Sequence, residues 1–254
     1  MSPESTPPRP TDPLSLCVVI PTLDEEEHVA ARVRRLLAAA DVRDRADRVV
    51  VVDGGSADRT RELALRAGAE VRRAARGRGT QLAAGAEGAT ETLLLFLHAD
   101  NAPAAGALAA VRRAFADPEL GYAGLRQRID AAGRFYRLVE RAADARVRRG
   151  MVYGDSGLAC RRTLYERVGG FAAVPLFEDV DLSRRLRRAG RWACIAEAEL
   201  RISARRWRAG GPLRTTLRNW MLRLAHAGGM RPERLARWYA PHAAAAGSAE
   251  RASR

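Results

Sequence analysis

Short apolar runs alternate with longer amphipathic segments along the first 120 residues. The runs end at Pro21, at Asp53 and at His98, and their length and apolar character are typical of buried strands. The predicted strands are 16–20, 49–52, 69–72 and 93–97. The segments between them space apolar residues as a helix does, and the predicted helices are 25–40, 58–67, 79–89 and 104–116. This alternation indicates an α/β fold with a mostly parallel central sheet flanked by helices.

The pattern loosens after residue 120. Further elements are predicted as a strand at 121–129, a basic helix at 134–149, a loop or strand at 154–161, and helices at 178–189 and 212–225. The proline-rich residues 1–13 and the last residues, 243–254, are expected to be disordered tails. We expect one domain over 14–210, divided into halves at 14–118 and 119–210, and then a helical extension at 211–242.

Carboxylates follow two of the predicted buried strands. Asp53 comes directly after four valines, and Asp100 comes three residues after Leu97. Open α/β sheets bind ligands at the carboxyl ends of their parallel strands. The sequence therefore predicts one crevice with two carboxylates, which a nucleotide and its metal ion could share.

The charge balance narrows the choice of partner. The 254 residues include 44 basic residues, all arginine, against 30 acidic residues, which gives a formal net charge of +14. This excess favours anions such as diphosphates or acidic lipid head groups. Specific nucleic-acid binding is disfavoured, because aromatic residues make up only 6% of the chain and the arginines are spread over many predicted helices.

The cysteines, the N-terminus and the length of the apolar runs indicate where in the cell the protein is located. Cys17, Cys160 and Cys194 lie far apart, without the spacing of a metal site or a disulfide framework. The N-terminus lacks the pattern of a cleavable signal, and apolar runs fall short of the ~18 residues that a membrane span needs. We expect a cytoplasmic protein, with contact at the inner face of the cell membrane left open.

Four acidic segments occur in order: Val19–Glu26, Val52–Asp58, Leu97–Asp100 and Phe177–Asp181. Together they resemble the family 2 glycosyltransferases, which have the GT-A (Rossmann-like, nucleotide-diphospho-sugar transferase) fold, over roughly residues 14–210. In detail the chain is similar to the radical-SAM/selenodomain-associated, arsenosugar-biosynthesis-type branch. The resemblance implies an inverting, metal-dependent enzyme of hexosyltransferase type. It would move a sugar from a UDP- or GDP-sugar to a hydroxyl of a small molecule or lipid.

Two other functions are weighed against this one. A dinucleotide-dependent oxidoreductase is disfavoured, because Pro21-Thr22-Leu23-Asp24 stands where a glycine-rich turn would be required. A basic α/β module that binds nucleotides or a membrane surface, without transferase activity, is the non-enzymatic alternative. Steep loss of binding with salt, without affinity for nucleotide sugars, would favour that alternative.

Asp53 and Asp58 have different expected roles. A carboxylate can accept a hydrogen bond from the N–H of uracil or guanine, and in the resembling family the Asp at the place of Asp53 holds the base. The alternative is that Asp53 caps the turn through Gly54 and Gly55. Asp58 stands where a helix starts, and we interpret it as an N-cap.

Asp100 is the candidate metal ligand. A divalent cation neutralises the charge on a departing diphosphate, and Mg²⁺ or Mn²⁺ takes oxygen ligands. The family usually carries Asp-x-Asp here, whereas this chain has His98-Ala99-Asp100. His98 either contacts the nucleoside or metal, or packs beneath the site.

Asp179 is the candidate catalytic base. An inverting transfer needs a carboxylate to take the proton from the acceptor hydroxyl, and the resemblance gives Asp179 this role. Glu178 is placed beside it, on the acceptor side. The alternative is that both acids only offset the dipole of the helix that starts here.

The resemblance implies further contacts with the donor. The segment Arg76–Gly79 precedes a helix, and its glycines and arginines suit an anion, although a basic surface loop fits equally. Glu25 is either a nucleoside contact or a first-turn helix acid, and Trp207 lies either near the diphosphate or acceptor or in the core. The implied donor contacts are Pro21, Thr22, Leu23, Glu25, Asp53, Arg76, Gly77, Gly79, Ala99, Arg206 and Trp207.

Two further segments have competing interpretations. Gly154–Gly157 copies the string around the nucleophile of chymotrypsin-like proteases, but the chain is α/β and lacks the preceding histidine motif. The resemblance instead puts Gly154 and Asp155 on the acceptor side. The apolar stripe at 212–226 packs onto its own domain or makes peripheral contact with a membrane.

Overall fold

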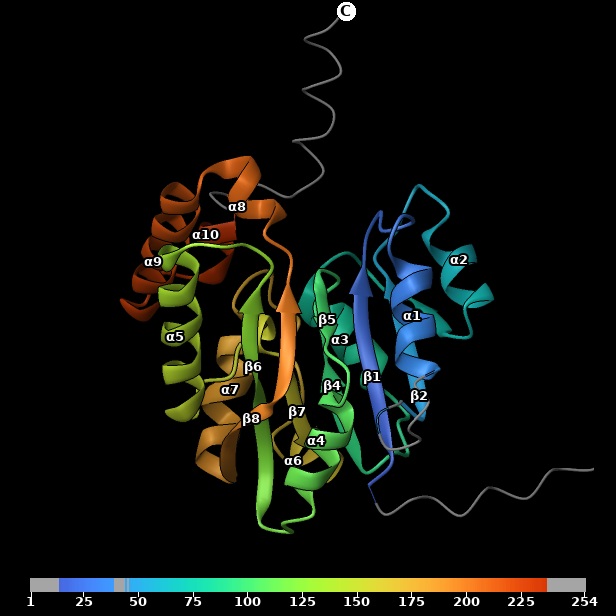
Figure 1. Ribbon diagram of the computed structural model, residues 1–254. Helices are drawn as coiled ribbons and strands as arrows, with labels where there is room; N and C mark the ends of the chain where they lie inside the picture. Colours follow the sequence, from blue (N-terminus) through green and yellow to red (C-terminus); the bar gives the residue numbers. More distant parts are fainter. Residues whose placement is uncertain (1–13, 39–43, 45, 237–254) are drawn as a thin grey trace, which may run out of the picture. The chain divides into compact units, whose positions relative to one another are not determined.

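The computed structural model describes residues 14–38, 44 and 46–236, which form two compact units (Figure 1). The first unit consists of the residues up to Ala173 together with Glu178–Ala204, and the second of Val174–Phe177 with the residues from Arg205 onward. The expected tails, 1–13 and 243–254, lie outside the described residues, as do 39–43 and 237–242. The domain bounds expected at 210 and 242 stay predictions.

The first unit contains an eight-stranded sheet in the order β3-β2-β1-β4-β7-β6-β8-β5. Strands β1 to β4 are parallel to their neighbours within this group, and β6 is parallel to β8. Strands β7 and β5 run antiparallel to the strands beside them. The α/β fold with a mostly parallel sheet is therefore confirmed. The strands are β1 (Leu16–Thr22), β2 (Arg48–Asp53), β3 (Glu70–Arg73), β4 (Leu93–Phe96), β5 (Asn101–Pro103), β6 (Leu120–Ile129), β7 (Leu158–Arg161) and β8 (Arg191–Ile202).

Helices cover both faces of this sheet (Figure 1). Val19 and Val50 belong to a core cluster with Leu82 of α3 and Leu182 of α7. Val18, on the opposite face of β1, is equally buried. Strands buried on both faces explain the nearly continuous valine and leucine runs of the sequence. The helices are α1 (Val29–Leu37), α2 (Thr60–Arg66), α3 (Arg78–Ala86), α4 (Ala107–Phe115), α5 (Arg134–Arg148), α6 (Arg162–Arg167) and α7 (Glu178–Ala189), with a 3₁₀ turn, η2, at Gly154–Ser156.

The second unit is helical and has its own small core. Leu176, Leu222 and Leu235 are buried together, and Phe177 stacks on His226 with ring centroids 4.5 Å apart. Among the described helices of both units, none is long and apolar enough to cross a membrane. The helices of this unit are α8 (Arg205–Gly210), α9 (Pro212–Ala227) and α10 (Pro232–Ala236).

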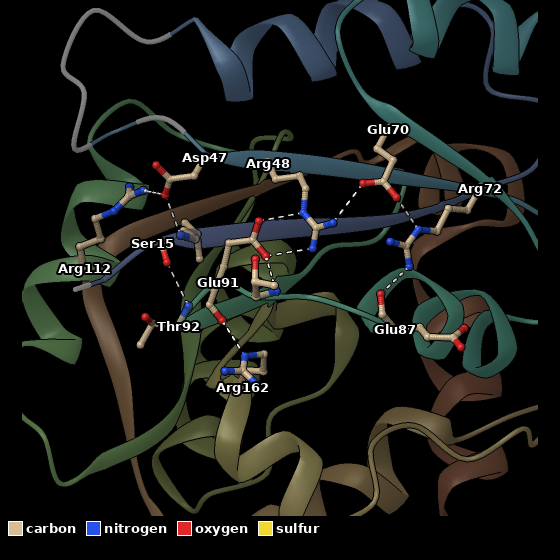
Figure 2. A network of polar contacts seen from close by, with 12 residues as sticks. Ser15, Asp47, Arg48, Glu70, Arg72, Glu87, Glu91, Thr92, Arg112 and Arg162 are labelled. Carbon is tan, nitrogen blue, oxygen red and sulfur yellow. Dashed lines mark hydrogen bonds and ion pairs between the residues drawn. The ribbon is translucent and has the colours of Figure 1, made fainter. Parts of the chain in front are cut away.

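Polar side chains clamp the amino ends of the parallel strands (Figure 2). Arg48, which begins β2, pairs with Glu91 at 2.8 Å and with Glu70 of β3 at 3.0 Å. Glu70 also pairs with Arg72 at 2.6 Å, and Arg162 donates to the carbonyl of Glu91 at 3.1 Å. These ion pairs hold the amino ends of the strands together. The carboxyl ends, on the opposite side of the sheet, can therefore form a site.

Strand β1 continues through Pro21 to Thr22, so the expectation that Pro21 ends it was wrong. The pairing of β1 with β4 stops at Val19, whereas its pairing with β2 runs on to Thr22. Pro21 thus lies where β1 has a paired neighbour on one side only. A proline without an N–H is tolerated at such a position.

Candidate active site

Asp53 lies at the carboxyl end of β2, level with Thr22 of β1, and is 1% exposed. Its carboxylate accepts hydrogen bonds from the backbone N–H of Gly55 and of Ser56, each at 3.1 Å, and from the Ser56 hydroxyl. Arg61 approaches it to 3.8 Å. These contacts show that Asp53 caps the turn after β2, while its contact with a base stays a prediction.

The loops that follow β1 and β2 are joined to each other. The carboxylate of Asp24 accepts from the N–H of Ala57 at 2.9 Å, and the N–H of Glu25 donates to the Thr60 hydroxyl at 2.8 Å. Helix α2 begins at Thr60 and its N-cap residue is Arg59, so the interpretation of Asp58 as the N-cap was wrong by one residue, although its carboxylate accepts from the N–H of Thr60 at 2.9 Å. The two loops therefore form a single preorganised rim.

Gln81 supports this rim from beneath, a role that the sequence pattern did not indicate. Its side chain is 5% exposed and donates to the carbonyls of Thr22, at 3.0 Å, and Val52, at 2.8 Å. A Cβ on Gly54 would lie 3.0 Å from the Gln81 amide. Glycine at 54 thus lets the turn sit directly on this buried side chain.

The Arg76–Gly79 segment leads into α3, as expected. Gly77 has φ +147°, a conformation suited to glycine, while Arg76 is exposed. Arg78 forms an ion pair of 3.0 Å with Glu178 at the start of α7. The contact links α3 to α7, and a diphosphate role for this segment stays a prediction.

Glu178 and Asp179 differ in environment although they are adjacent. Glu178 is 1% exposed, and burial raises the pKa of its carboxyl against the opposing charge of Arg78, while the charge of Asp179 adds to the rise. Asp179 is only partly buried. An incoming hydroxyl can therefore approach Asp179 more readily than Glu178.

Gly154 is contacted by side chains from two distant segments of the chain. Its N–H donates to the Asp179 carboxylate at 2.9 Å, and its carbonyl accepts from the Asn101 amide at 3.0 Å. A Cβ at this position would lie 1.9 Å from Nε2 of His98. The structure thus places His98, Asn101 and Asp179 around one glycine. The sequence analysis did not predict that His98 or Asn101 would contact Gly154.

His98, Glu178 and Asp179 bring possible metal-ligand atoms to within 4.8 Å of one another, as a group found in the part of the chain that the structure describes. His98 follows β4, and the two acids begin α7. Asp100 lies two residues beyond His98, partly exposed, and its carbonyl accepts from the N–H of Ser203 at 3.4 Å. The expected ligand Asp100 follows the same strand as His98 but is not a member of this group, so its role as a metal ligand stays a prediction.

Asp155 and Ser156 are held by neighbouring side chains. Arg146 of α5 pairs with Asp155 at 2.5 Å and donates to the Ser156 hydroxyl at 2.8 Å. Gln127 also donates to this hydroxyl, at 3.0 Å, and Ser156 is 0% exposed. This environment supports the rejection of a protease-like nucleophile.

Arg206 and Trp207 belong to α8 in the second unit. The Trp207 indole N–H donates to the Thr216 hydroxyl at 3.1 Å. The Arg206 side chain lies outside the described residues. The donor contacts expected of this pair stay predictions.

With this geometry established, comparison with protein families gives a match. The model described as "Glycosyl transferase family 2" matches residues 17–174, more than half of the chain. The chain belongs to glycosyl transferase family 2. This family 2 membership confirms the broader resemblance, while the radical-SAM-associated branch is not confirmed. A comparison with curated proteins found no match.

Solved structures support the same fold for this family 2 protein. The mannosyltransferase PcManGT from Pyrobaculum calidifontis, in complex with GDP-Man and Mn²⁺, is 21% identical with a TM-score of 0.63, over 88% of this chain and 64% of that chain. S. aureus TarS 1–349 is 15% identical with a TM-score of 0.58, over 75% and 60%. Glucosyl-3-phosphoglycerate synthase from Mycobacterium tuberculosis, in complex with Mn²⁺, UDP and glucosyl-3-phosphoglycerate, is 19% identical with a TM-score of 0.51, over 74% and 69%. The chain thus spans less than two thirds of the first two structures.

Proposed function

We propose that the protein is an inverting, metal-dependent glycosyltransferase that moves a sugar from a UDP- or GDP-sugar to an acceptor hydroxyl. The observation that carries this proposal is the convergence on Gly154. There a partly exposed carboxylate, Asp179, is held by a backbone N–H at the carboxyl edge of a family 2 sheet. The solved structures with GDP-Man, or with UDP and Mn²⁺, support this choice of donor class and metal.

The donor would lie on the rim formed by the loops after β1 and β2. Asp53 would accept the hydrogen bond of the base, with Pro21, Thr22, Leu23 and Glu25 around the nucleoside. The bonds of Asp53 to its own turn hold its carboxylate in place at the rim, where a base would have to share one of its oxygens. The diphosphate would reach Arg76, Gly77, Gly79 and Ala99.

The residues present suit a divalent cation. Asp100 would hold Mg²⁺ or Mn²⁺ on the diphosphate, and from the group of His98, Glu178 and Asp179 only His98 would supply a further ligand, since an imidazole nitrogen suits a transition metal such as Mn²⁺. When bound, the ion would neutralise the negative charge that develops on the leaving diphosphate. A neutral imidazole in place of the usual first acid leaves Asp100 to supply the negative charge.

Asp179 would act on the acceptor. Its carboxylate would take the proton from the acceptor hydroxyl as that oxygen forms a bond to the anomeric carbon and the bond to the diphosphate breaks. Attack from the side opposite the leaving group inverts the anomeric centre. Glu178, buried and paired with Arg78, would position Asp179 rather than receive the proton.

The acceptor is proposed to be a small molecule or a lipid, and the location cytoplasmic. Cys17, Cys160 and Cys194 are free thiols, which suits a reducing compartment. A lipid acceptor would bring the protein to the inner face of the cell membrane, where Arg206 and Trp207 would lie near the diphosphate or acceptor. The competing function is a basic α/β module without transferase activity. It would have the same fold but would need no catalytic base.

Product formation from UDP- and GDP-sugars in the presence of Mn²⁺, measured by mass spectrometry, tests the proposal. Asp100→Ala and Asp179→Asn should each abolish transfer while the melting temperature stays close to that of the wild type. The asparagine at 179 keeps an oxygen that can accept the N–H of Gly154, so the loop should keep its shape. Full activity of either purified variant would overturn the assignment of that residue.

A further inference from the structure

Helix α9 of the second unit has two opposite faces of different character. Thr215 and Leu222, at 7% and 6% exposed, lie on one side, and Leu222 packs with Leu176 and Leu235 in the core of this unit. The other side carries large apolar residues that remain exposed. They are Leu217 (61%), Trp220 (56%), Met221 (56%) and Leu224 (70%).

The exposed residues follow helical spacing. Positions 217, 220, 221 and 224 fall within an arc of about 100°, and 215 and 222 lie on the far side of the helix. The outer stripe is therefore a continuous apolar surface, whereas single exposed apolar residues are ordinary on a protein. The helix is anchored to its unit by its inner face, which leaves the outer face available for a partner.

The charge around this stripe indicates the kind of partner. The segment 205–232 contains seven arginines and no acidic residue. Arg214 is exposed beside one edge of the stripe, and Arg218 is exposed farther round the same side. Long arginine side chains can extend past an apolar face to reach anionic groups at its border.

We propose that α9 lies in the interface of an anionic lipid bilayer, with Leu217, Trp220, Met221 and Leu224 in the acyl boundary and the arginines among the head groups. An apolar stripe of this width, bordered by arginines and containing a tryptophan, is the pattern of an interfacial helix. Charge favours a bilayer over a second copy of the chain, because two arginine-rich surfaces without acids would repel each other. The inference concerns the second unit alone and holds whether or not the donor is correctly assigned.

The test is co-sedimentation of the full chain with vesicles of phosphatidylcholine alone or with added phosphatidylglycerol. The protein should bind the anionic vesicles, and raising the salt concentration should weaken the binding. The double variant Leu217→Gln/Leu224→Gln should bind at least about tenfold more weakly, because two apolar side chains no longer leave water. Leu65→Gln/Leu138→Gln is the matched control, since Leu65 on α2 and Leu138 on α5 of the first unit are 64% and 66% exposed.

Charge reversal gives a second arm. Arg214→Glu should weaken binding to anionic vesicles more than Arg35→Glu, an exposed arginine on α1 that undergoes the same change of net charge. Equal losses from the two leucine variants, or from the two arginine variants, would overturn the proposal in favour of non-specific attraction. Absence of binding to anionic vesicles would overturn it as well. Self-association that the α9 leucine variant abolishes would assign the stripe to a second copy of the chain.

Discussion

At the scale of single residues, Gly154 is held by contacts to three side chains, His98, Asn101 and Asp179, from two distant parts of the chain. The contact with His98 is the tightest, because a Cβ at 154 would lie 1.9 Å from the imidazole. Gly154→Ala should therefore destabilise the protein by about 1–3 kcal/mol through overpacking. Adding His98→Ala should restore part of that loss, since it removes the clashing ring.

The double-mutant cycle is measured by thermal or denaturant unfolding of the wild type, both single variants and the double variant. Losses that simply add would contradict the packing of His98 on Gly154. The single variant His98→Ala tests the other role considered for His98, which is metal binding. A loss of Mn²⁺ affinity in this variant, measured without donor, would show that His98 contributes to metal binding.

Asn101 has a positioning role that activity can separate from stability. Its buried amide donates to the carbonyl of Gly154, whose N–H in turn holds Asp179. Asn101→Ala should lower kcat while leaving the KM for the donor nearly unchanged. It should also cost about 1 kcal/mol of stability, because the buried carbonyl loses its side-chain donor and keeps only the N–H of Gly157 at 3.3 Å.

Gln127→Ala is the matched control for Asn101. Gln127 is also a buried amide, at 4% exposed, and it donates to the Ser156 hydroxyl rather than to Gly154. A similar stability loss with a smaller effect on kcat is expected for this variant. Equal effects of both variants on kcat would assign Asn101 a structural role only.

At the scale of elements, the ion pairs at the amino ends of the strands should make stability depend on pH. Burial opposes ionisation of Glu70, but the hydrogen bond and charge of Arg72 and the charge of Arg48 outweigh it, so the pKa of Glu70 is lowered in the folded protein. A lowered carboxyl pKa adds stability above the pKa of the unfolded chain, and this contribution is lost as the pH falls through the folded value.

Glu70→Gln should therefore be less stable than the wild type near pH 7. The difference should shrink as the pH falls below about 4, where the carboxylate of the unfolded chain is itself protonated. Its size should stay below about 1 kcal/mol, because the Glu70 side chain is 40% exposed and solvent screens the pairs. Urea unfolding across this pH range checks it, and 1 M salt should reduce the difference at neutral pH. A difference that grows on acidification would contradict this origin.

Elements with strong periodicity could be predicted from the sequence, and weakly patterned ones could not. Helix α7 was predicted with the bounds that the structure shows, because its apolar positions and its acid-to-arginine order agree. Strand β8 was missed. Its residues 196–202 alternate between apolar and polar types, a signal that the sequence analysis overlooked, but residues 191–195 do not, and its pairing with β6 shifts register between Leu125 and Arg126. The short β5 was missed because three residues carry no usable period.

The residues of the candidate site could also be predicted from the sequence only in part. Asp53 could be placed after a strand and Asp179 at the start of a helix because each stands in a recognisable order, while their meeting with Asp100 in one site stays a prediction. The Arg78–Glu178 ion pair and the Asn101 contact could not be found in this way. Both join residues far apart in the chain, and no local pattern of side chains specifies a partner at long range.

At the scale of the whole molecule, a donor that binds only the folded state must raise the melting temperature. A UDP- or GDP-sugar at a hundred times its dissociation constant should add about 2.7 kcal/mol of stability. For a protein of this size, that corresponds to a shift on the order of 5–10 °C. The shift should require Mn²⁺ or Mg²⁺ and disappear with a chelator, because the ion and Asp100 together would hold the diphosphate.

The pattern across nucleotides and variants distinguishes the enzyme from a basic binding module. The enzyme should respond to nucleotides of one base class. Asp53→Ala should weaken that response, whereas Asp179→Asn should leave it intact because Asp179 is proposed to act on the acceptor. A module that binds through its net charge of +14 should instead respond to all nucleoside diphosphates alike and lose the response as salt rises. If stabilisation is selective and metal-dependent while Asp179→Asn is inactive, donor binding and proton transfer are separate functions of the site. If stabilisation instead falls with salt and is the same for every nucleobase, the transferase assignment is refuted.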